Sequence, residues 1–109
     1  MALEDYTKTI QLKPDYSSAY NNRGSLYDDM GQQDKALADY NKAIQLKPDY
    51  SSAYNNRALL YAAMGQQDKA LADYSKAIQL KPDYNEAYNN RGLLYKAMGQ
   101  QDKALADYN

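Results

Sequence analysis

The chain of 109 residues is short enough for one domain, and its 14 acidic residues nearly balance its 13 basic ones. This balance argues against a nucleic-acid-binding surface or an anionic-membrane patch, because both need clustered Lys and Arg. The lack of Cys and His excludes a disulfide framework, a zinc site built on those residues and a Ser-His-Asp arrangement. No apolar run is typical of a transmembrane segment or a signal peptide, so the compartment stays open, with the cytoplasm as the default.

Residues 1–16 are expected to form one helix. Leu3, Tyr6 and Ile10 recur at helical spacing and share one face. Pro14 ends this helix, because proline lacks an N–H and disfavours helical geometry at the residue before it. The segment matches residues 35–50, so it corresponds to the second half of a longer unit.

The first complete unit begins with a helix over residues 15–30, for which Asp15 is a candidate N-cap. Gly31 is the expected left-handed residue that stops it. A second helix starts at Gln33 and ends before Pro48. The unit is therefore helix, Gly turn, helix, Pro turn.

This unit repeats along the chain with a step of 34 residues, from Tyr16 to Tyr50 and from Tyr50 to Tyr84. Residues 17–50 and 51–84 are complete repeats, whereas residues 1–16 and 85–109 are partial ones. Neither helix of a unit could bury its apolar face alone, so neighbouring units must stack. We predict a single all-α domain of seven helices that form a solenoid.

The pattern of small and aromatic positions resembles the tetratricopeptide repeat (TPR) family. The matching positions are Tyr20, Gly24, Tyr27, Ala36, Tyr40, Ala43 and Pro48 in the first complete unit, Tyr54, Ala58, Tyr61, Ala70, Tyr74, Ala77 and Pro82 in the second, and Tyr88, Gly92, Tyr95, Ala104 and Tyr108 in the third. The resemblance covers the whole chain. It implies a right-handed superhelix of antiparallel helix pairs, with a concave face lined by the first helix of each pair.

Arg23, Arg57 and Arg91 depart from the family pattern, which often has Leu there. An Arg at this position can lay its stem along the core and send its head to solvent or to a neighbouring carboxylate.

Catalysis is not expected, because the adjacent Asp28 and Asp29 point in different directions on a helix and cannot form an acid/base pair. No metal or cofactor site is expected.

The first helices carry the candidate partner-binding residues, which are Asn21, Asn22, Ser25, Asn55, Asn56, Leu59, Asn89, Asn90, Leu93 and Lys96. An Asn amide both donates and accepts hydrogen bonds, so the paired Asn residues could grip an extended peptide. Hydrogen bonding within the scaffold explains them equally well.

Differences between the repeats also gather on the first helices. Ser25 with Asp28 is polar and acidic, whereas the equivalent pair Leu59 and Ala62 is apolar, and Lys96 makes the third pair partly basic. The differences could tune a groove along its length. Drift at exposed positions of a recently duplicated or designed array is the simpler explanation. Glu86 could instead form a capping box with Asp83.

One TPR subtype holds the terminal carboxylate of chaperone tails with Lys, Asn and Arg side chains. The positions that correspond to this clamp are Asn21, Ser25, Asn56, Glu86 and Asn90. Only Asn56 matches, and Glu86 has the wrong charge. We therefore expect no tight binding of acidic chaperone tails.

The two ends of the array carry apolar residues like those of an interior repeat, where solenoids usually finish with polar capping helices. The residues expected to be exposed there are Leu3, Tyr6, Ile10, Leu105 and Tyr108.

The resemblance to the TPR family implies a non-catalytic protein–protein interaction scaffold whose concave groove takes an extended peptide or a partner helix. The alternative is a designed or excised array without a native ligand, which self-associates by end-to-end stacking or by exchange of terminal helices.

Overall fold

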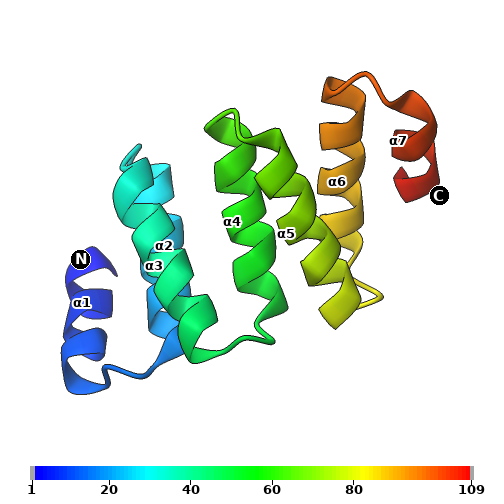
Figure 1. Cartoon of the computed structure of the whole chain (residues 1–109). Coiled ribbons are helices and arrows are strands. Elements are labelled where there is room, and N and C mark those ends of the chain that lie inside the picture. Colours follow the sequence, from blue (N-terminus) through cyan, green and yellow to red (C-terminus); the bar gives the residue numbers. More distant parts are fainter. Residues whose placement is uncertain (1, 109) are drawn as a thin grey trace.

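The computed structural model describes residues 2–108, and within them it contains seven helices and no strand. The helices are α1 (Ala2–Leu12), α2 (Ser17–Asp29), α3 (Gln33–Leu46), α4 (Ser51–Ala63), α5 (Gln67–Leu80), α6 (Asn85–Ala97) and α7 (Gln101–Tyr108) (Figure 1). The predicted all-α class and the number of helices are confirmed.

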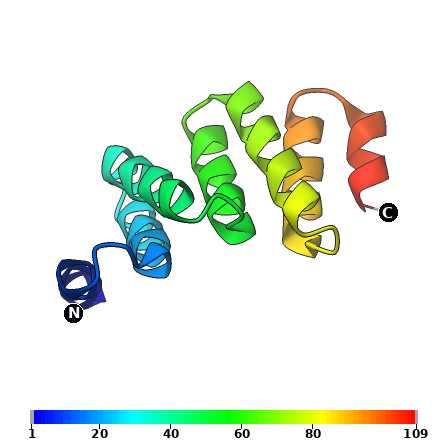
Figure 2. The ribbon, with the colours of Figure 1, turned by 60° about the horizontal axis from the view of Figure 1, so that its bottom comes forward.

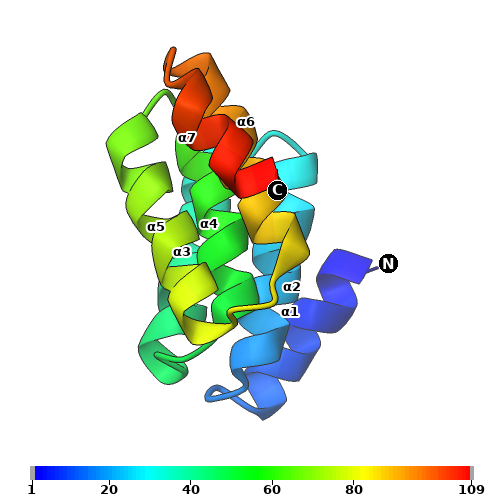
Figure 3. The same ribbon diagram turned by 90° about the vertical axis from the view of Figure 1, so that its right-hand side faces the viewer.

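The helices pack as antiparallel pairs, α2 with α3, α4 with α5 and α6 with α7, and the pairs stack along an axis 47 Å long. Helix α2 also contacts α4, and α4 contacts α6, whereas α1, α3, α5 and α7 do not contact one another in the described part of the chain. The stack therefore has an inner layer of α2, α4 and α6 and an outer layer of the other helices (Figure 2). Viewed along the stack, α1 and α7 lie on different sides, so successive pairs are rotated relative to one another (Figure 3).

Each helix pair turns at a glycine with a left-handed backbone. Gly31, Gly65 and Gly99 have φ angles of 77°, 78° and 78°. Glycine adopts this conformation without steric cost, and it lets the next amide reach back to the helix. The N–H of Gln32 accordingly donates to the carbonyl of Tyr27 at 2.8 Å. The stop residues predicted from the sequence are confirmed at these turns.

The predicted helix caps are wrong. Helix α2 begins after Tyr16, and α6 begins after Tyr84, with no side-chain capping bond at either residue. The turn after each Pro places the Tyr at the N-cap position in an extended conformation, as in Tyr16 with φ −87° and ψ 92°. Asp15 and Asp83 thus lie one residue too early, and the helices start without side-chain caps.

The core between paired helices is made of small residues that surround one buried Tyr per repeat. Ala36 and Ala70 are fully buried, and Tyr40 and Tyr74 are 2% exposed. A Cβ added at Gly24 would lie 2.8 Å from Cε1 of Tyr40, which shows how closely α2 approaches α3. Burial raises the pKa of Tyr74 to about 12, so its phenol stays neutral at physiological pH. None of the described helices is long and apolar enough to cross a bilayer.

Candidate functional site

Six residues of the inner layer form two rows that run from helix to helix, and together they are called the inner strip. One row is Ser25, Leu59 and Leu93, and the other is Asp28, Ala62 and Lys96. Members of a row are 34 residues apart and occupy equivalent places on α2, α4 and α6. The rows therefore compare three versions of the same surface.

The apolar part of the inner strip forms a hollow between α4, α5 and α6. Its lining includes Leu59, Ala62, Asn90, Leu93 and Tyr74, and its volume is about 260 Å³. Leu59 is 43% exposed and Leu93 is 58% exposed. Two large aliphatic side chains thus stand in solvent one repeat apart, beside a hollow with mainly apolar walls.

The α2 part of the inner strip is acidic. Asp28 is half-buried, and this burial, followed by the nearby charge of Asp29, raises the pKa of its carboxyl. Ser25 lies beside the hydroxyl of Tyr40, and burial together with Asp28 raises the pKa of that phenol. Tyr40 is equivalent to Tyr74, which lines the apolar hollow. Ser25 and Asp28 are therefore equivalent to Leu59 and Ala62 of that hollow, one repeat earlier.

The first Asn of a pair is used to hold neighbouring repeats together. Asn21 and Asn55 are buried. Asn56 donates to Oδ1 of Asn21 at 3.1 Å, which joins α4 to α2, and Asn90 donates to Oδ1 of Asn55 at 3.3 Å, which joins α6 to α4. These bonds favour the scaffold interpretation for Asn21 and Asn55.

The other four Asn residues differ in how much of the side chain is exposed to a partner. Asn22 and Asn89 are exposed, whereas Asn56 and Asn90 are half-buried and each donates one of its two amide hydrogens to the scaffold. Asn90 also lines the apolar hollow. Among the candidate Asn residues, the structure thus leaves Asn22, Asn56, Asn89 and Asn90 available for contact.

Each of the three unusual Arg residues forms a bidentate ion pair with an Asp sixteen positions later. Arg57 donates to both carboxylate oxygens of Asp73 at 2.7 Å and 2.8 Å, and the same two bonds join Arg23 to Asp39 and Arg91 to Asp107. The hydrogen bond to Asp73 raises the pKa of Arg57, which therefore stays charged. A neighbouring carboxylate was one of the two partners expected for these Arg heads, and the constant spacing of sixteen residues was the signal in the sequence that could have identified each Asp.

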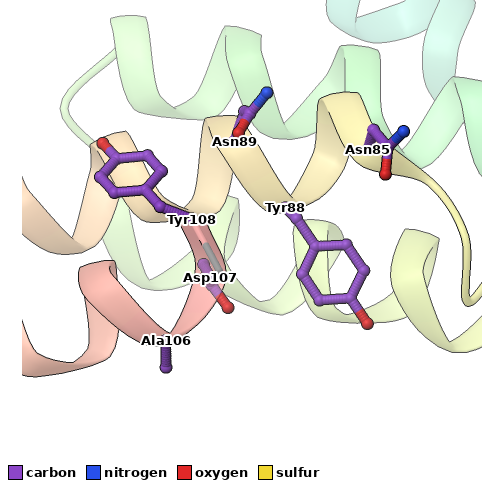
Figure 4. A pocket seen from close by; sticks show the side chains of 6 residues that line it. All are labelled: Asn85, Tyr88, Asn89, Ala106, Asp107 and Tyr108. Atoms are coloured by element: carbon purple, nitrogen blue, oxygen red, sulfur yellow. The ribbon is translucent and has the colours of Figure 1, made fainter.

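A second hollow, with a volume of about 590 Å³, is lined by residues of α6 and α7. It is lined by Asn85, Tyr88, Asn89, Ala106, Asp107 and Tyr108 (Figure 4). Leu105 and Tyr108 are 59% and 43% exposed. At the other end, α1 has no buried residue, but its apolar face is not fully open, because Leu3, Tyr6 and Ile10 are half-buried.

Family models match the chain over most of its length. One tetratricopeptide repeat model matches residues 17–50, a second matches residues 39–72, and a TPR repeat model matches residues 60–99. Among curated proteins none matches the chain.

Solved structures with the same fold include the crystal structure of MamA, at 32% identity and a TM-score of 0.88, over 97% of this chain and 62% of that one. YrrB, a TPR protein with an unusual peptide-binding site, shares the fold at 23% identity with a TM-score of 0.89, over 96% of this chain and 54% of that one. The first TPR domain of Spaghetti (RPAP3), bound to the HSP90 peptide SRMEEVD, is 28% identical with a TM-score of 0.84, over 89% of this chain and 77% of that one.

The chain spans less than two thirds of the length of MamA and YrrB. TPR scaffolds are usually non-catalytic modules for protein–protein or peptide interaction. The repeat pattern, the paired helices and the family matches agree, and the chain belongs to the TPR repeat family.

Proposed function

We propose that the inner strip binds a segment of a partner protein, with Leu59 and Leu93 as its main apolar contacts. The observation that carries this proposal is the exposure of both Leu side chains beside one hollow. Fully burying an exposed Leu side chain is worth about 2 kcal/mol, and about half of each of these two side chains is still exposed, so the pair contributes about 2 kcal/mol. Polar contacts must supply most of the roughly 8 kcal/mol that micromolar affinity requires. Asn56 and Asn90 lie on the same helices and each keeps a free amide hydrogen for such contacts.

The Spaghetti TPR domain supports the same use of the fold, because it is a relative solved with a bound peptide. In this chain the inner layer of α2, α4 and α6 is the surface on which successive repeats present equivalent side chains. A partner that lies across these helices contacts several repeats at once, and each repeat adds to its affinity.

A peptide-display library selected against the 109-residue chain tests the proposal. We expect enriched peptides to bind the wild type and to lose at least tenfold in affinity when Leu59→Glu and Leu93→Glu are combined. Leu105→Glu is the matched control, because Leu105 is equally exposed but lies on α7. Unchanged binding by the double variant, or no enriched peptide at all, would contradict the proposal.

A second candidate function is end-to-end association of chains, and the hollow on α6 and α7 favours it. Asn89 corresponds to Asn21 and Asn55, which each accept a hydrogen bond from the next inner helix. Asn89 is exposed and lines this hollow, so an inner-layer helix from another repeat fits there. Sedimentation of the 109-residue chain should then show association that rises with concentration and weakens in Ala106→Glu, because Ala106 is exposed and lines the hollow. A monomer at every concentration would contradict this second function.

A further inference from the structure

We infer that the inner strip selects partners by the order of their charges. The partner carries Lys or Arg where it meets α2, an apolar side chain over the hollow of α4 and α6, and Asp or Glu where it meets Lys96. This inference rests on the proposed function, and it names the chemistry of the segment that the strip accepts.

The charges of the inner strip change sign from α2 to α6. Asp28 and Asp29 stand on α2, two alanines take their places on α4, and Lys96 with Ala97 takes them on α6. None of the three ion pairs in the described part of the chain involves these charged residues. Glu86 is the one acidic residue on α6, but it lies ten residues from Lys96, about 15 Å along the helix, so it does not neutralise the charge of Lys96.

The two acidic residues at the end of α2 lower the stability of the fold itself. Asp28 and Asp29 occupy the last turn of α2, where negative charge opposes the helix dipole. Burial without a cationic partner also raises the pKa of Asp28, so its ionised form is disfavoured there. Ala62 and Ala63 show that the repeat folds without acids at these positions. A cationic side chain from a partner would remove both penalties.

The spacing of the helices sets the length of the segment. Packed helices lie about 8–10 Å apart, and an extended chain advances about 3.3 Å per residue. The path from α2 through α4 to α6 therefore covers about six residues of an extended partner. The basic and acidic residues should flank the apolar one at about three positions on each side.

The experiment measures charge coupling with one synthetic peptide, chosen from the display selection described above. Changing its basic residue to Glu should weaken binding to the wild type about fivefold or more, and Asp28→Lys combined with Asp29→Ala should restore it. Changing its acidic residue to Lys should be rescued only by Lys96→Asp. Lys already occupies the equivalent position on α6, so Asp28→Lys is compatible with the fold.

Each charge change in the peptide must be rescued only by the matching change in the chain, at Asp28 for the basic residue and at Lys96 for the acidic one. Selected peptides without opposite charges around an apolar centre would overturn the inference, and so would additive effects with no rescue. In both cases, binding that still depends on Leu59 and Leu93 would leave the proposed function intact. If the display library yields no enriched peptide, the proposed function and this inference are both wrong.

Discussion

Arg57 holds three helices together at one point. From α4 it pairs with Asp73 on α5 through two hydrogen bonds, and it donates a third to Oδ1 of Asn41 on α3 at 2.9 Å. Its guanidinium also lies 5.5 Å and 5.6 Å from the ring centroids of Tyr54 and Tyr61, within the range of cation–π attraction. The same arrangement recurs at Arg23 and Arg91, with Thr7 and Ser75 in place of Asn41.

Arg57→Ala should lower the free energy of unfolding by about 3 kcal/mol, because it leaves a buried carboxylate without a partner. The side chain of Asp73 is only 8% exposed. Urea denaturation followed by circular dichroism measures the loss. The double variant Arg57→Leu with Asp73→Ala is the control, and it should be more stable than Arg57→Ala. Equal stability of wild type and Arg57→Ala would show that the ion pair contributes nothing.

At the scale of the helix, the distance within a pair depends on one small position. Gly24 faces Tyr40, and an added Cβ would lie 2.8 Å from the ring of Tyr40 and 3.3 Å from the carbonyl oxygen of Ala36. The equivalent residue on α4 is Ala58, which is fully buried beside Tyr74. The pair of α4 and α5 thus accommodates a methyl group at the position that Gly24 occupies in α2.

Gly24→Ala should change the free energy of unfolding by less than about 1 kcal/mol, because the better helix propensity of Ala offsets the shift of Tyr40. Gly24→Leu should cost about 3 kcal/mol or more, since α2 and α3 would have to separate. Thermal denaturation of both variants measures the difference. Equal losses for Ala and Leu would mean that α2 and α3 cannot adopt the spacing of α4 and α5.

At the scale of the whole molecule, the inner layer has the wrong charges for an acidic chaperone tail. Asp28 and Asp29 lie at one end of it, and Glu86 is exposed at the start of α6. Asn21, which corresponds to a clamp position, is buried and bonded to the next repeat. The acidic residues repel a carboxylate, and the buried Asn21 is not accessible to hold one.

The peptide SRMEEVD should therefore bind this chain more weakly than roughly 1 mM in a calorimetric titration. The Spaghetti TPR domain, which was solved with this peptide, is the positive control. Glu86→Lys should strengthen the residual binding, because it removes a like charge. Micromolar affinity of the wild type would refute the prediction.

The sequence determined the helices, their turns and their stacking, because these depend on short-range patterns that recur every 34 residues. Gly31 was recognisable as a left-handed stop, and Gly24 and Ala36 as small positions of the repeat pattern, and the structure places them at the turn and at the close approach of α2 to α3. The candidate strip was also visible, because the repeats differ mainly there.

Only the tertiary structure decided the partners of individual polar groups. Asn21 and Asn56 are 35 residues apart, and whether they meet depends on the rotation of α2 against α4, which helical periodicity leaves open. The ion pair of Arg57 and Asp73 depends in the same way on how α4 faces α5. Local spacing determines which face of a helix a residue occupies, but the packing of whole helices determines what that face meets.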